Sequence, residues 1–149
     1  MKKNKTILIT GSTGYIGKNL TSFLKEKNSD LNIVTTVRTE NSKNVFLDSS
    51  KNIFPIENFN DQEIILLHLA TYFSKNPADK ELTYLSNETF GKNLLFELGN
   101  YNLKGVIYTN TMYSFYPSIE VRNLDYTKSK NNFSKFLLEL TASKSIPYE

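Results

Sequence analysis

The chain of 149 residues carries 18 Lys and Arg against 15 Asp and Glu, and it has no cysteine. This length limits it to one domain. The small positive surplus forms no basic stripe, so nucleic acid is not an expected partner. The absence of thiolates and the single histidine, His68, argue against a metal centre. Near the start only residues 7–9 form an apolar run, too short for a signal peptide or membrane span, so we expect a cytoplasmic protein.

Short apolar runs alternate with helical patterns, which predicts an α/β fold: a Rossmann-like, doubly wound parallel sheet formed by residues 1–149 as one domain. In chain order we expect a strand at 6–10, a helix at 15–27, strands at 32–37, 45–48 and 64–70, a helix at 80–100, a strand at 105–109 and a helix at 126–143. In the first helix, helical spacing places four apolar residues on one face: Ile16, Leu20, Phe23 and Leu24.

Three glycines, Gly11, Gly14 and Gly17, lie between the first predicted strand and the first predicted helix. A dinucleotide site needs glycines there because the chain turns tightly, the backbone approaches a pyrophosphate, and the helix N-terminus offers free N–H groups. The spacing is GxxGxxG, which differs from the GxGxxG of the simplest Rossmann proteins. The alternative interpretation is a glycine-rich turn without a ligand.

Tyr126 and Lys130 stand four residues apart at the start of the last predicted helix. This spacing places both side chains on one face of the helix, about one turn apart. A lysine ammonium beside a tyrosine favours the phenolate, as general acid or base catalysis requires. The alternatives are a tyrosine packed at the surface and a solvated lysine.

With these motifs the chain resembles the extended short-chain dehydrogenase/reductase family of NAD(P)-dependent sugar-nucleotide epimerases, dehydratases and ketoreductases. The resemblance rests on an ordered set of motifs: the glycine loop, Asp48, the run His68-Leu69-Ala70, Asn87, and Thr111 with Tyr126-x-x-x-Lys130. Residues 87–95 and 109–113 look most like the branch of CDP-abequose synthase-type 4-ketoreductases.

The resemblance implies roles for individual residues. Tyr126 would exchange a proton with a sugar hydroxyl or ketone, Lys130 would hold the nicotinamide ribose, and Thr111 would hydrogen-bond the substrate oxygen. The implied cofactor-binding residues are Gly11, Ser12, Thr13, Gly14, Tyr15, Ile16, Gly17, Arg38, Asp48, Leu69, Ala70, Asn87, Tyr126 and Lys130. Thr111 has a plain alternative as an ordinary strand-end residue.

The end of the second predicted strand bears on the choice of cofactor. An acidic residue there would bind the ribose 2′-hydroxyl of NAD, whereas Arg38 can pair with the 2′-phosphate of NADP, so NADP is favoured over NAD. Arg38 could equally be a solubilising surface residue, Asp48 an exposed strand-end carboxylate, and Asn87 an exposed amide. His68 is interpreted as a packed, hydrogen-bonded strand residue.

In this family the Tyr-x-x-x-Lys helix is followed by a sixth strand and a smaller substrate-binding region, which residues 144–149 do not provide. We therefore expect the N-terminal part of a longer enzyme, with the fifth strand at an edge of the sheet. Two functions follow: an enzyme that moves hydride between nicotinamide and a nucleotide-activated sugar, or a dinucleotide-binding fragment without turnover. By analogy with the family, a homodimer would form through the helices around Asn87 and Tyr126.

Overall fold

The computed structural model describes residues 4–37, 45–46, 48–49, 59–110 and 124–143. Its sheet has five parallel strands in the order β3-β2-β1-β4-β5. The strands are β1 (Asn4–Thr10), β2 (Asn32–Val37), β3 (Val45–Phe46), β4 (Gln62–His68) and β5 (Asn102–Tyr108). The order reverses between β1 and β4, which confirms the predicted doubly wound, Rossmann-like fold.

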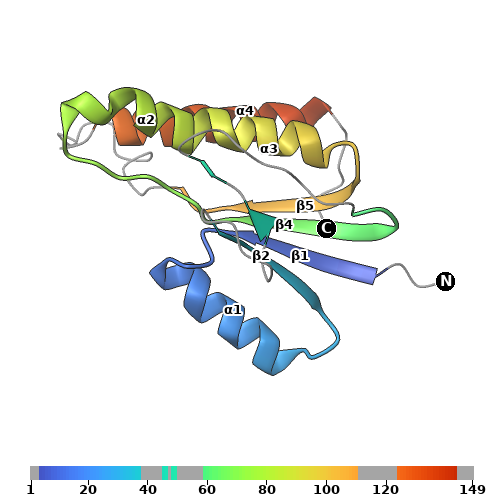
Figure 1. Cartoon of the computed structure of the whole chain (residues 1–149). Helices are drawn as coiled ribbons and strands as arrows, with labels where there is room; N and C mark the ends of the chain where they lie inside the picture. Colours follow the sequence, from blue (N-terminus) through green and yellow to red (C-terminus); the bar gives the residue numbers. More distant parts are fainter. Residues whose placement is uncertain (1–3, 38–44, 47, 50–58, 111–123, 144–149) are drawn as a thin grey trace.

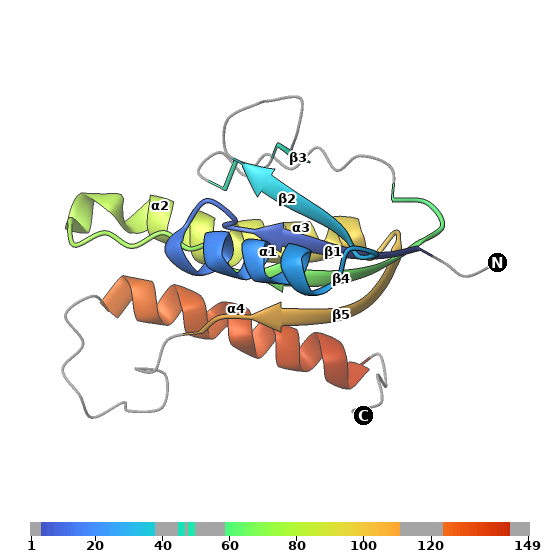
Figure 2. The same ribbon diagram turned by 90° about the horizontal axis from the view of Figure 1, so that it is seen from below.

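Helices lie on both faces of the sheet (Figure 1). One face carries α1 (Tyr15–Lys27). The opposite face carries η1 (Pro77–Asp79), α2 (Lys80–Tyr84), the π-helix η2 (Leu85–Thr89), α3 (Phe90–Leu98) and α4 (Leu124–Ser143). Figure 2 shows α4 running beside β5, and α4 also contacts α2, η2 and α3.

The core lies between the sheet and the α3–α4 layer. Its buried residues come from β1, β4, α3 and α4 together with one residue before β4: Leu8, Phe59, Ile64, Leu66, Phe90, Leu94, Leu95, Leu98 and Phe133. Apolar residues at helical spacing on α3 face the strands, as the periodicity predicts. This layer fixes the position of α4 over β4 and β5.

The apolar face predicted for α1 is only partly buried. Leu20 and Leu24 are half-buried, but Ile16 is 59% exposed and Phe23 is 53% exposed. Periodicity shows that these side chains share a face, but it does not show how much surface is available to cover them. In the described part of the chain, α1 has no helical neighbour on its face of the sheet (Figure 1).

Several element boundaries differ from the prediction. β4 ends at His68, opposite the last residue of β1, Thr10. The next two N–H groups, of Leu69 and Ala70, donate to the main-chain and side-chain oxygens of Thr10. β5 begins at Asn102 and not at the predicted residue 105. The prediction started late because it followed apolar residues, and a polar residue such as Asn102 does not mark a strand in that pattern. The single helix predicted at 80–100 is divided by the π-helix η2.

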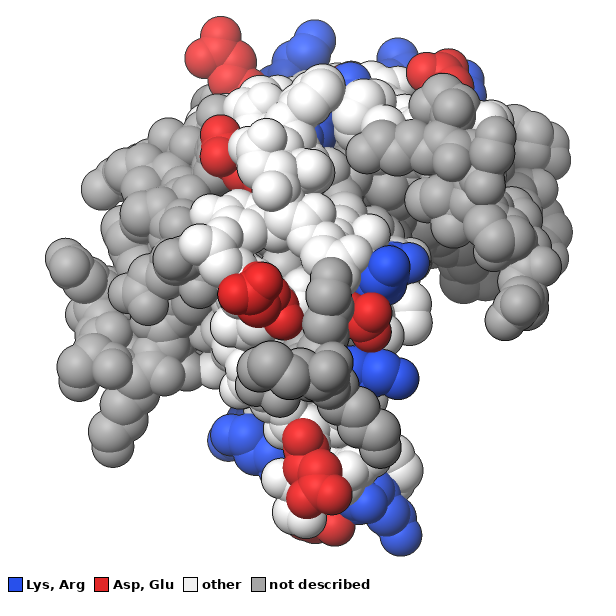
Figure 3. All heavy atoms as spheres, turned by 90° about the vertical axis from the view of Figure 1, so that its right-hand side faces the viewer, with Lys and Arg blue, Asp and Glu red and all other residues white. Residues whose placement is uncertain are grey.

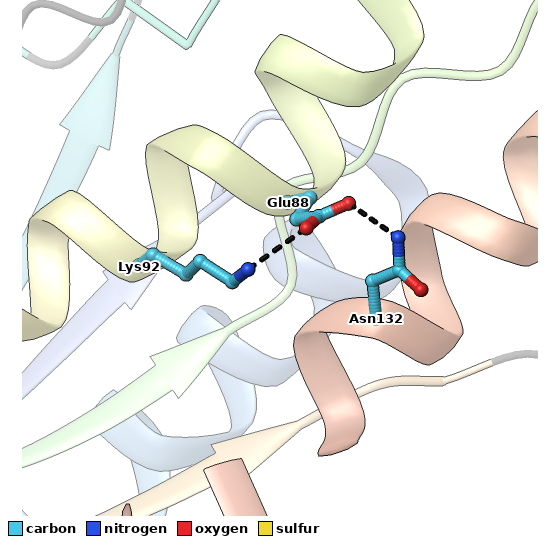
Figure 4. A network of polar contacts seen from close by, with 3 residues as sticks. All are labelled: Glu88, Lys92 and Asn132. Carbon is cyan, nitrogen blue, oxygen red and sulfur yellow. Dashed lines mark hydrogen bonds and ion pairs between the residues drawn. The ribbon is translucent and has the colours of Figure 1, made fainter. Parts of the chain in front are cut away.

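A polar network joins the two helices that cover the core (Figure 4). The Glu88 carboxylate accepts hydrogen bonds from the Lys92 ammonium and from the Asn132 amide, each at 2.8 Å. The Lys92 ammonium also lies 5.4 Å from the centre of the Phe136 ring. Glu88 and Lys92 are one turn apart, and Asn132 adds the connection to α4.

The face of the molecule in Figure 3 shows no field of one charge. On the face in Figure 3, acidic and basic side chains lie interspersed between uncharged residues. None of the helices in the described ranges combines the length and apolar character that crossing a membrane requires.

Candidate functional site

A pocket lies at the carboxyl ends of β1, β2 and β4, where the glycine loop meets the segment after β4. Parallel strands bring their carboxyl ends to one edge, and ligands of open α/β sheets bind at the point where the strand order reverses. Five predicted cofactor-binding residues line this pocket: Gly11, Thr13, Gly14, Leu69 and Ala70. The other lining residues are Thr10, Thr36, Val37, Ser49, Thr71, Tyr72 and Phe90.

Two of the three glycines are required by the geometry of the loop. Gly11 has φ +72°, and a Cβ there would lie 2.7 Å from the main-chain nitrogen of Ala70. A Cβ on Gly17 would lie 2.2 Å from the carbonyl oxygen of Gly11. Both contacts are with backbone, which cannot move aside without breaking the loop. The loop therefore packs directly against the first turn of α1 and against the segment after β4.

The N-terminus of α1 points its backbone N–H groups toward this loop. Gly14 is the N-cap, and within the described structure no side chain caps the helix and no acidic residue lies in its first turn. The first intrahelical bond joins the Lys18 N–H to the Gly14 carbonyl at 2.9 Å. An uncapped helix N-terminus carries partial positive charge and attracts an anionic group such as a phosphate.

The remaining residues of the loop differ in where they point. The Ser12 hydroxyl donates to the Thr36 carbonyl at 2.8 Å, so it fastens the loop to β2. Thr13 is exposed and lines the pocket. Tyr15 is 88% exposed, and Ile16 is also exposed on the first turn of α1. Of these four residues, Thr13 is thus the one that lines the pocket.

His68 closes the strand side of the site from within the core. It is fully buried, and its Nδ1 lies 2.8 Å from the Thr10 hydroxyl oxygen, which accepts a hydrogen bond from the Ala70 N–H at 3.2 Å. Burial, and secondly the charge of Lys130, lower the pKa of His68 to about 3. A ring that is neutral at pH 7 and packed in the core holds the ends of β1 and β4 together, as the sequence interpretation of His68 expects.

Asn87 is buried in the π-helix η2 and joins three segments. Its Oδ1 accepts hydrogen bonds from the Thr71 hydroxyl at 3.1 Å and from the Tyr72 N–H at 2.8 Å. Its Nδ2 donates to the Tyr72 carbonyl at 2.8 Å and to the Ser129 hydroxyl at 3.3 Å. The exposed-amide alternative is therefore wrong. Asn87 fixes the pocket-lining segment relative to α4, which carries Tyr126 and Lys130.

Lys130 lies in the first half of α4 and is buried, with 1% of its surface exposed. Its ammonium lies 4.2 Å from the centre of the Tyr108 ring, close enough for a cation–π contact. Burial lowers the pKa of Lys130 to about 8. The alternative interpretation of Lys130 as a solvated charge is wrong, because solvent does not reach it.

Tyr126 is half-buried on the same helix, and its carbonyl accepts a hydrogen bond from the Ser129 hydroxyl at 2.9 Å. Its ring packs edge-on against Phe73, with ring centres 5.2 Å apart and an interplanar angle of 83°.

Tyr108, the residue that the Lys130 ammonium contacts, also stacks its ring on His68, with ring centres 5.6 Å apart. Burial raises the pKa of Tyr108, and the proximity of Tyr126 raises it further.

Sequence reasoning missed Tyr108 and Phe73 as members of the site. Tyr108 ends an apolar strand and resembles any core aromatic. Phe73 lies in a segment without periodicity. The signal that could have found it is its position three residues after the His68-Leu69-Ala70 run.

Of the three remaining predicted residues, the structure describes only Asp48. Asp48 is buried, 7% exposed, and directly precedes Ser49, which lines the pocket. It is therefore not an exposed strand-end carboxylate. Thr111 and Arg38 lie outside the described residues.

The family model described as "NAD dependent epimerase/dehydratase family" matches residues 7–143. The chain belongs to this family. The match confirms the broad resemblance found in the sequence. A comparison with curated proteins finds no match.

Solved structures share the fold at low sequence identity. A short chain dehydrogenase family protein from Francisella tularensis is 18% identical with a TM-score of 0.77, over 95% of this chain and 64% of that one. UDP-glucuronic acid 4-epimerase from Bacillus cereus, in complex with NAD, is 20% identical with a TM-score of 0.68, over 95% and 53% of the two chains.

UDP-glucose 4-epimerase from Thermotoga maritima, with UDP-glucose, is 17% identical with a TM-score of 0.68, over 92% of this chain and 51% of that one. The 149-residue chain, a member of the epimerase/dehydratase family, thus spans about half to two thirds of the length of these three proteins.

Proposed function

We propose that the chain provides the cofactor and proton-transfer groups of an NAD(P)-dependent epimerase, dehydratase or reductase that acts on a nucleotide-activated sugar. The observation that carries the proposal is the glycine loop, in which a Cβ at Gly11 or Gly17 would collide with backbone. Such a loop, next to an uncapped helix N-terminus, fits the pyrophosphate of a dinucleotide. Residues 1–149 would form one NAD(P)-binding domain.

The residues present fit a nicotinamide dinucleotide. The glycine loop and the first turn of α1 would hold the pyrophosphate, and Leu69 and Ala70 would line the path toward α4. When bound, the nicotinamide would accept or supply hydride at a sugar carbon. Ser12 would contribute by holding the loop against β2, since its hydroxyl is already bonded to Thr36.

In the proposed chemistry Tyr126 exchanges a proton with the sugar oxygen, and Thr111 hydrogen-bonds that oxygen. Lys130 supplies positive charge on the same helix face, where its low solvent exposure strengthens its electrostatic effect. Asn87 positions both groups indirectly, because it ties α4 to the pocket-lining segment through Ser129 and Tyr72.

The finer parts of the proposal concern the cofactor and the branch of the family. Arg38 would pair with a 2′-phosphate and so favour NADP over NAD. The sequence at 87–95 and 109–113 supports a 4-ketoreductase of the CDP-abequose synthase type.

A second candidate function is a dinucleotide-binding module without turnover. It is favoured by one observation: the chain spans only about half of the length of the Bacillus cereus and Thermotoga maritima epimerases. The two candidates share cofactor binding and differ in turnover of a nucleotide sugar.

A titration with NADPH and NADH, followed by reduced-nicotinamide fluorescence, tests the shared part of both candidates. We expect saturable binding that is tighter for NADPH, and loss of binding in Gly17→Ala. The matched control is Gly105→Ala, because a Cβ on Gly105 meets nothing within 4 Å. Absence of binding by the folded chain, verified by circular dichroism, would refute the proposal.

Turnover is tested with Tyr126→Phe, which should bind cofactor normally and lose activity on the nucleotide sugar. Full activity in this variant would rule out the acid/base role of Tyr126.

The proposal includes a homodimer through the helices around Asn87 and Tyr126. Phe96 on α3 and Leu138 on α4 expose 66% and 63% of their surfaces, which supports an apolar contact at this layer. Sedimentation of Phe96→Glu would show a shift to monomer if α3 forms the contact.

A further inference from the structure

Phe73 exposes 55% of its surface, yet the chain on both sides of it is held in place. The main-chain N–H and carbonyl of Tyr72 bond to the buried amide of Asn87, each at 2.8 Å. The hydroxyl groups of Tyr72 and Ser74 both donate to the Asp79 carboxylate, at 3.1 Å and 2.6 Å. The exposed ring is therefore carried by a fixed backbone, and a ligand that packs on it pays little entropy for ordering it.

The position of the ring relates it to the proposed chemistry. Residues 69–72 line the pocket, and Phe73 follows directly, at the end nearest α4. There its ring contacts the Tyr126 ring edge-on, with ring centres 5.2 Å apart. Phe73 thus contacts the side chain that is proposed to exchange the proton.

We infer that Phe73 forms an aromatic subsite for the sugar ring of the nucleotide-activated substrate, packing against the apolar C–H face of the pyranose. This inference rests on the proposed function. The negative face of an aromatic ring attracts the positively polarised C–H groups of a sugar, and the contact also buries apolar surface. A phenylalanine adds no polar atom that would compete for the hydroxyl groups of the sugar.

The geometry favours the sugar over the other parts of the ligands. The pyrophosphate belongs at the glycine loop, which lies at the opposite end of the segment from Phe73. The group that touches Tyr126 is the one whose oxygen exchanges a proton, and in the proposed reaction that group is the sugar. Phe73 would therefore act as a specificity-determining residue that orients the reacting carbon.

The sequence contains no tryptophan, so Phe73→Trp introduces a single fluorophore at this subsite. The probes are UDP-glucose, UDP and glucose, each added to protein saturated with NAD. We expect UDP-glucose to change the indole emission in a saturable way, and UDP to change it less. NADH is titrated separately, because energy transfer from the indole to bound reduced nicotinamide reports cofactor binding alone.

The matched control is Phe96→Trp, which places the indole on α3. Phe96 contacts Phe136, and Phe136 follows Tyr126 by ten residues, about 15 Å along α4. We expect this variant to respond to NADH by energy transfer and to give no response to UDP-glucose. Equal responses to UDP-glucose in both variants would overturn the inference, because they would report a change of the whole molecule.

Binding affinity gives a second test, in which Phe73→Leu removes the aromatic ring and Phe73→Tyr, which keeps it, is the reference. In Phe73→Leu we expect binding of UDP-glucose to weaken about threefold to tenfold, with Phe73→Tyr retaining it and NADH affinity unchanged in both. Unchanged UDP-glucose affinity in Phe73→Leu, or no UDP-glucose binding while NADH binds, would overturn the aromatic subsite. Failure of NADH to bind any variant or the parent chain would instead refute the proposed function and, with it, this inference.

Discussion

The two faces of the sheet are packed to different degrees. On the face beneath α3 and α4, nine apolar residues form a closed cluster, and the polar groups of Asn87, Glu88 and Asn132 join the helices above it. On the face of α1, Ile16 and Phe23 are more than half exposed. Ile107 of β5 is 59% exposed, and it belongs to this face because its neighbours Val106 and Tyr108 pack against the cluster.

This difference indicates where the domain gains its stability. The closed face supplies most of the buried apolar surface and also carries Tyr126 and Lys130, so the residues proposed for proton transfer stand on the helix that closes the core. The open face carries α1, whose N-terminus is part of the proposed cofactor site. Substitutions on the two faces should therefore have very different costs.

Removal of a ring from the closed face should have the largest effect. Phe133 is fully buried and contacts His68 and Tyr108 edge-on, so Phe133→Ala should lower the free energy of unfolding by about 3–5 kcal/mol. Urea denaturation measures the change. Phe23→Ala, on α1 of the opposite face, is the control and should cost under about 1 kcal/mol. Equal losses would contradict the picture of a single dominant face.

Asn87→Leu should rank next, with a loss of roughly 2–4 kcal/mol in unfolding free energy. The substitution leaves the main-chain groups of Tyr72 without their side-chain partner in a buried place. Asn132→Ala removes one exposed amide bond to Glu88 and should change stability by less than about 0.5 kcal/mol. Equal losses in both variants would show that the buried hydrogen bonds of Asn87 contribute no more to stability than one exposed bond.

Lys130→Met should stabilise the protein near pH 7, by at most about 3 kcal/mol, since the buried ammonium has its pKa lowered from 10.5 to about 8. Between those values the unfolded chain binds more protons, so wild-type stability rises with pH. Below about pH 8 the full cost is present. The difference in unfolding free energy between the variant and wild type should thus shrink from pH 8 to pH 10.5 in a series of urea denaturations. A difference that stayed constant would show that folding does not lower the pKa of Lys130.

Phe23→Ser on the open face should have the smallest effect, within about 0.5 kcal/mol, because its side chain is already largely hydrated. Thermal unfolding of the variant measures it. A loss above about 2 kcal/mol would mean that another part of the protein covers α1, and the contrast between the faces would disappear.

The order of the elements along the chain could be predicted because apolar runs and helical spacing are local signals. The apolar run at 64–70 predicts a buried strand, and β4 spans Gln62–His68. Exposure could not be predicted in the same way: Phe23 and Leu24 look alike in the pattern, but coverage depends on which helices share a face. The boundaries of β4 and β5 moved where polar residues and side-chain bonds decide the pairing.

Part of the candidate site could also be predicted. Gly11 and Gly17 were recognisable because tight backbone approach admits glycine only, and the four-residue spacing gave the common face of Tyr126 and Lys130. The burial of Lys130 against the Tyr108 ring could not be predicted, because that contact joins a helix to a strand across the core. Nor does any sequence signal announce that Asn87 bonds to residues 15 and 42 positions away.

The π-helix η2 has a consequence for insertions and deletions in this region. A π-turn holds one residue more than the α-helical turn it replaces. A residue in a π-turn advances the helix by roughly 80°, against about 100° in an α-helix. Deleting one residue within Leu85–Thr89 would therefore allow regular α-helix to form while the flanking helices keep nearly the same rotation relative to each other. The core residues of α3 would still face the sheet, and the main loss would be the hydrogen bonds of Asn87, which depend on the extra residue.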